Sequence, residues 1–179
     1  MLDMTKTALI IIDVQGKLAT LMYKREEFFA NMVKIAQAAK VLELPIFWNE
    51  QLPDKLGPTI PELKDVLTDI EPLPKNSFSC YGNPEFRDKL KATHHKQILL
   101  TGMETHVCVY QTAMDLITNG YEVYLVADAV SSRTEENKLI GIQAIKMMGA
   151  NITSVEMCLF EMLKAAEGDK FKQIIKIVK

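Results

Sequence analysis

Short apolar runs alternate along the chain with longer segments in which apolar residues recur at helical spacing. Five of the runs are almost continuously apolar, which is expected of strands that are buried on both faces of a sheet. They cover residues 8–13, 44–49, 97–102, 122–128 and 151–157. Strands that alternate with helical segments indicate an α/β protein with a parallel sheet, because each parallel pair needs a crossover connection.

Three segments between these runs carry the apolar spacing of amphipathic helices. They cover residues 26–43, 109–120 and 135–150. The last two close at or near Gly120 and Gly149, and glycine is a common residue at helix ends. Residues 168–179 are also amphipathic, so we predict a C-terminal helix that docks on its own domain or on a neighbouring subunit.

The stretch from residue 51 to residue 76 is less regular than the rest. It holds five of the seven prolines, and one of them, Pro61, opens a short predicted helix over residues 61–67. A proline-rich excursion from a compact α/β domain usually lies over a sheet edge or a binding cleft.

Composition and charge exclude several classes of protein. The chain has 179 residues, of which 48% are hydrophobic, and this fits one domain over residues 1–179. The net charge is -2, and the charges form no basic block, so neither nucleic acid nor a membrane surface is expected as a partner. We expect a small-molecule substrate instead. The apolar run near the N-terminus is too short for a signal peptide or a membrane span, which favours a cytoplasmic protein.

The three cysteines, Cys80, Cys108 and Cys158, are odd in number and form no CxxC pair. We therefore expect free thiols in a reducing compartment, with neither a disulfide framework nor a structural zinc site. His94 and His95 are adjacent and His106 stands alone, so no metal is expected, although His106 could line a pocket. The chain also lacks the glycine-rich phosphate loops, and no cofactor is predicted.

Ligands of open α/β sheets bind beyond the carboxyl ends of the strands, so the residues that follow the apolar runs are the candidates for chemistry. Asp13 ends the first run, where a buried carboxylate would need a cation or a donor, although capping a helix is an equally good reading. Asp128 ends another run, and we interpret it as a cap for the helix that follows.

Cys108 stands where a strand turns into a helix. The helix dipole and the unpaired N–H groups there would favour a thiolate and could hold an oxyanion, although a small buried filler is the alternative. Cys80 and Cys158 lack such a setting and are predicted to be core residues. Lys75 follows a proline-stiffened apolar stretch and could point inward, although a surface position is usual for lysine.

These residues together resemble a known family. The segments "IIIDVQ", "PKNSFS" and "TGMETHVCV" are similar, in order and spacing, to the Asp, Lys and Cys motifs of the isochorismatase-like cysteine hydrolases, and the likeness runs from residue 7 to about residue 160. The resemblance implies a Rossmann-like, three-layer α/β/α fold with a six-stranded parallel sheet. It also implies a homo-oligomer.

The resemblance further assigns roles to the candidate residues. Cys108 would be the nucleophile, Asp13 would accept its proton, and Lys75 would hold Asp13 and favour the thiolate. The backbone N–H groups of Glu104 and Cys108 would form the oxyanion hole, and a cis peptide bond would lie between Met103 and Glu104.

Departures from the family pattern narrow the expected activity. Nicotinamidases of this family carry an Asp-x-His pair that binds a metal, whereas "WNEQLPDKLG" here contains no histidine. The chain is closer to the isochorismatase-domain branch. We expect hydrolysis of a small amide through a thioester-type intermediate. The alternative is a catalytically silent or redox-sensing scaffold that acts through its oligomer surface.

The substrate pocket is predicted from residues close to these strand ends. Three aromatic side chains, Trp48, Phe78 and Tyr81, could wall it, although packing in the core is the commoner use of aromatics. The predicted lining consists of Gln15, Trp48, Gln51, Phe78, Thr105 and His106.

Overall fold

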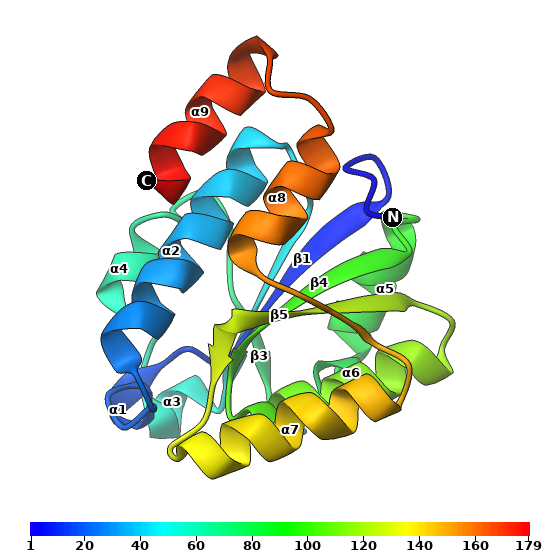
Figure 1. Ribbon diagram of the computed structural model, residues 1–179. Helices are drawn as coiled ribbons and strands as arrows, with labels where there is room; N and C mark the ends of the chain where they lie inside the picture. Colours follow the sequence, from blue (N-terminus) through cyan, green and yellow to red (C-terminus); the bar gives the residue numbers. More distant parts are fainter.

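The computed structural model describes all residues, 1–179, and its centre is a six-stranded, all-parallel sheet (Figure 1). The strand order is β3-β2-β1-β4-β5-β6. The strands are β1 (Thr7–Ile12), β2 (Ile46–Gln51), β3 (Leu73–Lys75), β4 (Gln97–Met103), β5 (Glu122–Ser131) and β6 (Asn151–Thr153). The predicted α/β class is confirmed, and so is the six-stranded sheet that the family resemblance implied.

Helices cover both faces of this sheet. The longer ones are α2 (Arg25–Val41), α5 (Pro84–Ala92), α6 (Tyr110–Thr118), α7 (Glu135–Met147), α8 (Val155–Leu163) and α9 (Gly168–Val178). Single turns make up α1 (Gly16–Ala19), α3 (Pro53–Leu56), α4 (Pro61–Lys64), a 3₁₀ turn (Cys80–Gly82) and a π-helical turn (Thr105–Val109). The predicted helices therefore exist, with α4 shorter than the proline pattern indicated.

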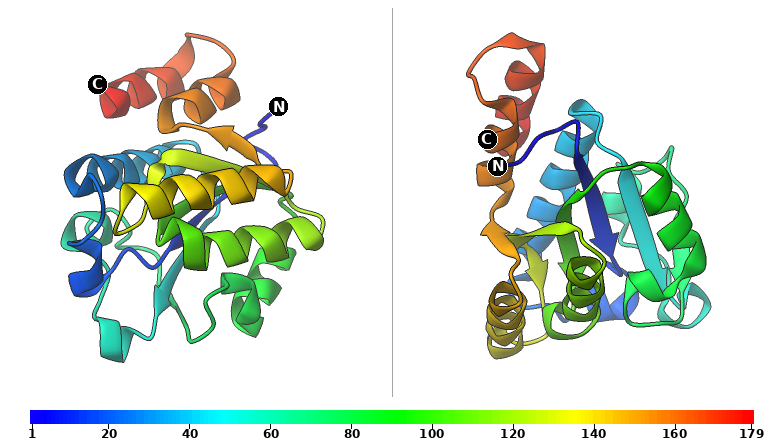
Figure 2. Two further views of the ribbon diagram at one scale, coloured as in Figure 1. Left: turned by 60° about the horizontal axis from the view of Figure 1, so that its bottom comes forward. Right: turned by 90° about the vertical axis from the view of Figure 1, so that its right-hand side faces the viewer.

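The central strand β1 shows why the fold has three layers. Successive side chains of a strand point to opposite faces, and every residue of β1 is buried. Leu9 and Ile11 pack into the core under α2, α8 and α9, while Ile10 and Ile12 pack into the core under α5, α6 and α7. Figure 2 shows α2, α8 and α9 on one side of the sheet and α5 on the other.

The last predicted strand is too long. The run over residues 151–157 is a strand only as far as Thr153, because Ser154 accepts a hydrogen bond from the N–H of Met157 and so caps α8. The C-terminal helix α9 docks on its own domain. Its Ile174 is fully buried, and Lys34 of α2 donates to the carbonyl of Val178.

The strand order places a crevice beside the end of β1. The chain runs from β1 outward through β2 to β3, and then returns to β4 on the other side of β1. This reversal is a topological switch point, where open α/β sheets bind their ligands. No helix is both long and apolar enough to cross a membrane.

Candidate active site

Lys75 is the last residue of β3, and its ammonium group is enclosed by oxygen atoms. Its Nζ atom donates to Asp13 Oδ2 at 2.7 Å and to Gln51 Oε1 at 2.6 Å. It also donates to the carbonyls of Ser77 and Phe78 at 3.1 and 3.0 Å. The side chain has no exposed surface, so the alternative reading of Lys75 as a solvated lysine is wrong.

Asp13 follows β1 directly, with a backbone φ of 55° that turns the chain away from the sheet. Its Oδ2 pairs with Lys75, while its Oδ1 is buried and has no hydrogen-bond partner of good geometry. Burial raises the pKa of this carboxyl above its ordinary range, against the opposing effect of Lys75. Asp13 is thus paired with a cation, as expected if its carboxylate is buried. The raised pKa makes it a stronger base than a solvated aspartate.

Cys108 lies in the π-helical turn between β4 and α6, with 7% of its surface exposed. Cys108 and Asp13 line the same pocket, and each group affects the pKa of the other. Burial first, and then the negative charge of Asp13, raise the pKa of Cys108. Both effects oppose the thiolate that the start of a helix was expected to favour.

Asp13 and Cys108 meet in a pocket of about 310 Å³. Most of the wall is apolar, and it is formed by Leu18, Leu56, Phe78, Met103 and Val107. Its other polar lining residues are Gln51, Glu104 and Arg133. The pocket lies at the switch point of the sheet, and its floor holds a thiol beside a carboxylate.

Gln51 and Phe78 are the two predicted pocket residues that do line this pocket. Gln15 does not, because its side chain is fully buried and holds the β2–α4 connection. Its Nε2 donates to the carbonyls of Gln51 and Gly57, and its Oε1 accepts from the N–H of Gln51. The prediction placed the residue near the site but gave it the wrong task.

Trp48, Thr105 and His106 also lie outside the pocket lining. The indole N–H of Trp48 donates to Thr59, so this side chain fixes the same connection from β2. Thr105 is fully buried and donates to the carbonyl of Ser131. His106 contacts the hydroxyl of Ser132 at 3.1 Å. Each polar group is already occupied in holding a loop.

Glu104 has a left-handed backbone with φ at 58°, and it precedes the turn that carries Cys108. Its N–H donates no backbone hydrogen bond. The expected cis peptide between Met103 and Glu104 is absent, because all peptide bonds are trans. The sharp turn is made instead by the positive φ of Glu104.

Apart from Phe78, the apolar wall was not predicted from the sequence, and neither was Arg133. Arg133 lies two residues beyond the end of β5, a strand that continues three residues past the predicted end at Asp128. Asp128 accepts from the N–H of Val155 and thus supports α8, whereas Thr134 caps α7, the helix that Asp128 was expected to cap.

Cys80 and Cys158 are fully buried, as predicted for core residues, and burial raises the pKa of each to about 12. No group of three or more His, Cys, Asp or Glu side chains is arranged to hold a metal ion.

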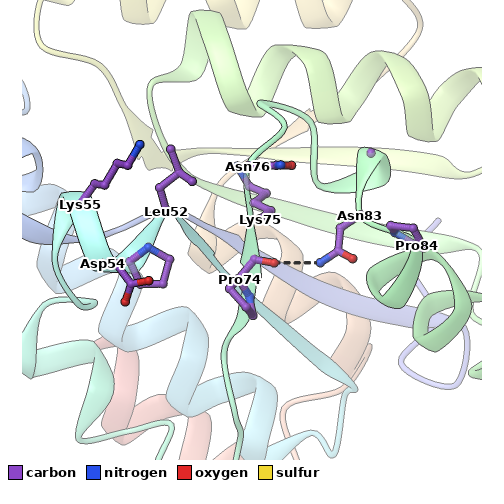
Figure 3. Close-up of a pocket in the computed structure, with 10 residues that line it drawn as sticks. Leu52, Asp54, Lys55, Pro74, Lys75, Asn76, Asn83 and Pro84 are labelled. Carbon is purple, nitrogen blue, oxygen red and sulfur yellow. Dashed lines mark hydrogen bonds between the residues drawn. The ribbon is translucent and has the colours of Figure 1, made fainter.

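A second hollow, of about 410 Å³, adjoins the site (Figure 3). It is lined from the start of α3, the end of β3 and the start of α5, and Asn83 donates there to the carbonyl of Pro74. Lys75 contributes to this lining, but its ammonium is bound to Asp13 and Gln51. The reactive groups therefore belong to the first pocket.

Fold and pocket define a three-layer α/β protein with a pocket at the switch point of a parallel sheet. The chain belongs to the isochorismatase family, since residues 7–157 match the isochorismatase domain. Membership of this family supports a hydrolase-type function.

Relatives and solved structures agree with this assignment. The chain is 38% identical to isochorismatase domain-containing protein 2 of Xenopus laevis, over 96% of this chain and 83% of that protein. It superposes with a TM-score of 0.92 on a structure described as the MAR1 ribonuclease of Caenorhabditis elegans, at 32% identity over 99% of this chain and 91% of that one. The YcaC protein of Escherichia coli, described as an octameric hydrolase of unknown specificity, shares the fold with a TM-score of 0.92 at 24% identity, over 98% of this chain and 88% of that one.

Proposed function

We propose that the protein is a cysteine hydrolase that cleaves an amide-type C–N bond in a small molecule. The observation that carries this proposal is the buried contact of Lys75 Nζ with Asp13 Oδ2, at 2.7 Å, beside the pocket that Asp13 and Cys108 line together. A buried acid with a raised pKa beside a thiol is the arrangement needed for a general base and its nucleophile.

The first half of the reaction forms a thioester. Asp13 takes the proton of the Cys108 thiol as the sulfur attacks the substrate carbonyl. The C–O π electrons move to the oxygen, and the backbone N–H groups of Glu104 and Cys108 stabilise that oxyanion. When the carbonyl re-forms, the C–N bond breaks and the proton on Asp13 passes to the leaving amine.

The second half regenerates the thiol. A water molecule attacks the thioester carbonyl through its oxygen, and Asp13 accepts a proton from that water. The C–S bond then breaks, the sulfur recovers the proton from Asp13, and a carboxylic acid leaves. Lys75 keeps Asp13 oriented, because its ammonium donates to Asp13 and is itself held by three other oxygen atoms, those of Gln51, Ser77 and Phe78.

Mass spectrometry of the protein during turnover of a panel of small amides and esters tests this mechanism. We expect an acyl adduct on Cys108 in the wild type, with turnover lost in Cys108→Ala and kept in Cys158→Ala. Iodoacetamide at neutral pH should label Cys108 before the other two cysteines, because only Cys108 lines the pocket. Preferential labelling of Cys80 or Cys158, or unchanged turnover in Cys108→Ala, would contradict the proposal.

The second candidate is a scaffold that is catalytically silent or senses redox state through its oligomer surface. Helix α7 exposes Leu139, Ile140 and Met147, the last with 80% of its surface open, and such an apolar face favours a homo-oligomer. Light scattering would measure the assembly, and reversible oxidation that changes it, without turnover of any substrate, would favour this candidate.

Nucleic acid and membrane are not among the proposed partners, and the three free thiols fit a cytoplasmic protein. Because the C. elegans neighbour carries the name ribonuclease, RNA belongs in the substrate panel. RNA cleavage that persists in Cys108→Ala would argue for a different chemistry.

A further inference from the structure

Arg133 brings a positive charge to the wall of the active-site pocket. Its side chain is 54% exposed and lines the pocket. Its Nε donates to Oε1 of Glu104 at 3.0 Å, and the side chain makes no other hydrogen bond. A guanidinium carries five N–H donors, so the four on Nη1 and Nη2 are without a protein partner.

The other cation beside the pocket has no donor to spare. Lys75 makes four hydrogen bonds with an ammonium group that has three N–H donors, and all four acceptors are protein oxygens. Arg133, with its Nη1 and Nη2 groups unpaired, is therefore the cation of this pair that can bind an anion in the pocket.

Glu104 fixes where those free donors lie. Its side chain is mostly buried, and its residue directly precedes the turn that carries Cys108. The bond to Nε ties the guanidinium to the backbone that positions the nucleophile and leaves the Nη edge open. That planar edge matches the two oxygens of a carboxylate.

We propose that the substrate is a small carboxylate, an inference that rests on the proposed function of the pocket. Its carboxylate binds Nη1 and Nη2 of Arg133, a short apolar body lies against Leu56 and Phe78, and the scissile carbonyl lies at Cys108. A pocket of about 310 Å³ is at the small end of ligand sites, which fits a compact molecule of this kind.

Two alkylating reagents of almost equal size test this subsite. Iodoacetate is an anion and iodoacetamide is neutral, and each forms a C–S bond with Cys108 as iodide leaves and the thiol proton passes to Asp13. With glutathione as the reference thiol, we expect the iodoacetate-to-iodoacetamide rate ratio to be raised at Cys108. It should fall about tenfold in Arg133→Gln, the loss expected for hydrogen bonds to a charged group. The control is Arg25→Gln, which removes an exposed arginine outside the pocket.

Two variants separate binding from other effects of the change. Arg133→Lys keeps the charge but not the planar edge, so it should recover only part of the ratio. Arg133→Gln removes the cation that pairs with Oε1 of Glu104, and the negative charge of Glu104 would then repel iodoacetate, although Nδ1 of His106 still lies 3.5 Å from Oε2. The double variant Glu104→Gln/Arg133→Gln removes both charges and should keep the low ratio. Recovery of the wild-type ratio in the double variant, or equal loss of both rates in Arg133→Gln, would overturn the proposal.

Equilibrium binding tests the subsite without a reactive thiol. In Cys108→Ala, calorimetry should detect butyrate binding that weakens about tenfold or more when Arg133→Gln is added, with no change for butyramide. Equal binding of butyrate with and without Arg133 would overturn the subsite, whatever the reactivity of Cys108. Butyrate binding that depends on Arg133, in a protein whose Cys108 resists both reagents, would support the subsite and contradict the proposed nucleophile.

Discussion

The ammonium nitrogen of Lys75 lies 2.7 Å from Oδ2 of Asp13, and both side chains are almost completely removed from solvent. These residues are 62 positions apart in sequence, and the pairing of β1 with β2 and of β2 with β3 brings them together. An ion pair with this burial is costly to form and more costly to break from one side, because the remaining charge then has no partner.

Lys75→Met should therefore destabilise the protein strongly. We expect the free energy of unfolding to fall by about 3 to 5 kcal/mol, the range for breaking a buried ion pair. Urea denaturation followed by circular dichroism measures this change. The matched control is Lys89→Met, which breaks an exposed pair with Glu85 and should cost about 0.5 kcal/mol or less. Similar losses in the two variants would mean that the buried pair contributes no more than a surface pair.

The reactivity of Cys108 should rise with pH through the pKa of Asp13. The carboxyl must be deprotonated to accept the thiol proton, and burial raises its pKa above the usual value of about 3.9. The midpoint of the acid limb, measured as the iodoacetamide rate at Cys108, is thus expected above that value. In Asp13→Asn the rate should drop by about 10² or more, and the acid limb of the pH profile should disappear. The control Asp169→Asn on α9 should keep the wild-type rate and the acid limb. If the acid limb persists in Asp13→Asn, the titration that produces it belongs to another group.

Sequence patterns predicted most of the sheet because four of its strands are long and nearly continuous in apolar residues. β3 has only three residues, Leu73–Lys75, and includes a proline, so the hydrophobic pattern is too short to predict a strand there. It forms because it is an edge strand, where Pro74 needs no ladder partner for its missing N–H. The sixth strand was expected from the family resemblance, and local propensity did not predict it.

The candidate site could be predicted where a residue ends a strand. Asp13 directly follows β1, Lys75 ends β3 and Cys108 lies in the turn after β4, and parallel strands all end at the same edge of the sheet. The pocket wall could not be predicted in this way. Leu56 and Arg133 reach it from connections whose paths depend on long-range contacts, such as the hydrogen bond from Gln15 to Gly57.

The buried thiols should make the protein less stable in alkali. Burial raises the pKa of Cys80 and Cys158 to about 12, whereas an unfolded cysteine titrates near 8.5. Between these values the native state holds protons that the unfolded state has lost, so stability falls as pH rises. Each thiol should contribute a slope of about 1.4 kcal/mol per pH unit in the middle of this window.

Urea denaturation at pH 7.5 and pH 9.5, under reducing conditions, measures this loss. Other groups titrate in the same window, so the informative comparison is with Cys158→Ala. This variant starts from a lower stability because of its cavity, but it should lose about 1.4 kcal/mol less between the two pH values. An equal loss in both proteins would show that Cys158 keeps an ordinary pKa.

Gly16→Ala should damage the pocket as well as the fold. Gly16 has a φ of 57°, and a Cβ atom there would lie 1.7 Å from the carbonyl oxygen of Leu56, a residue of the pocket wall. The clash must push α1 and α3 apart, so both the free energy of unfolding and the iodoacetamide rate at Cys108 should change.

The matched control is Gly120→Ala, because Gly120 has a similarly positive φ of 78° but no atom within 4 Å of the place that a Cβ atom would take. This substitution should lower the free energy of unfolding by about 1 to 2 kcal/mol, because an L-residue is strained in a left-handed backbone. It should leave the iodoacetamide rate at Cys108 unchanged. Because both variants share the backbone cost, the extra loss in Gly16→Ala measures the contact with Leu56. Equal stability losses with an unchanged rate at Cys108 would show that the β2–α4 connection yields without disturbing the pocket.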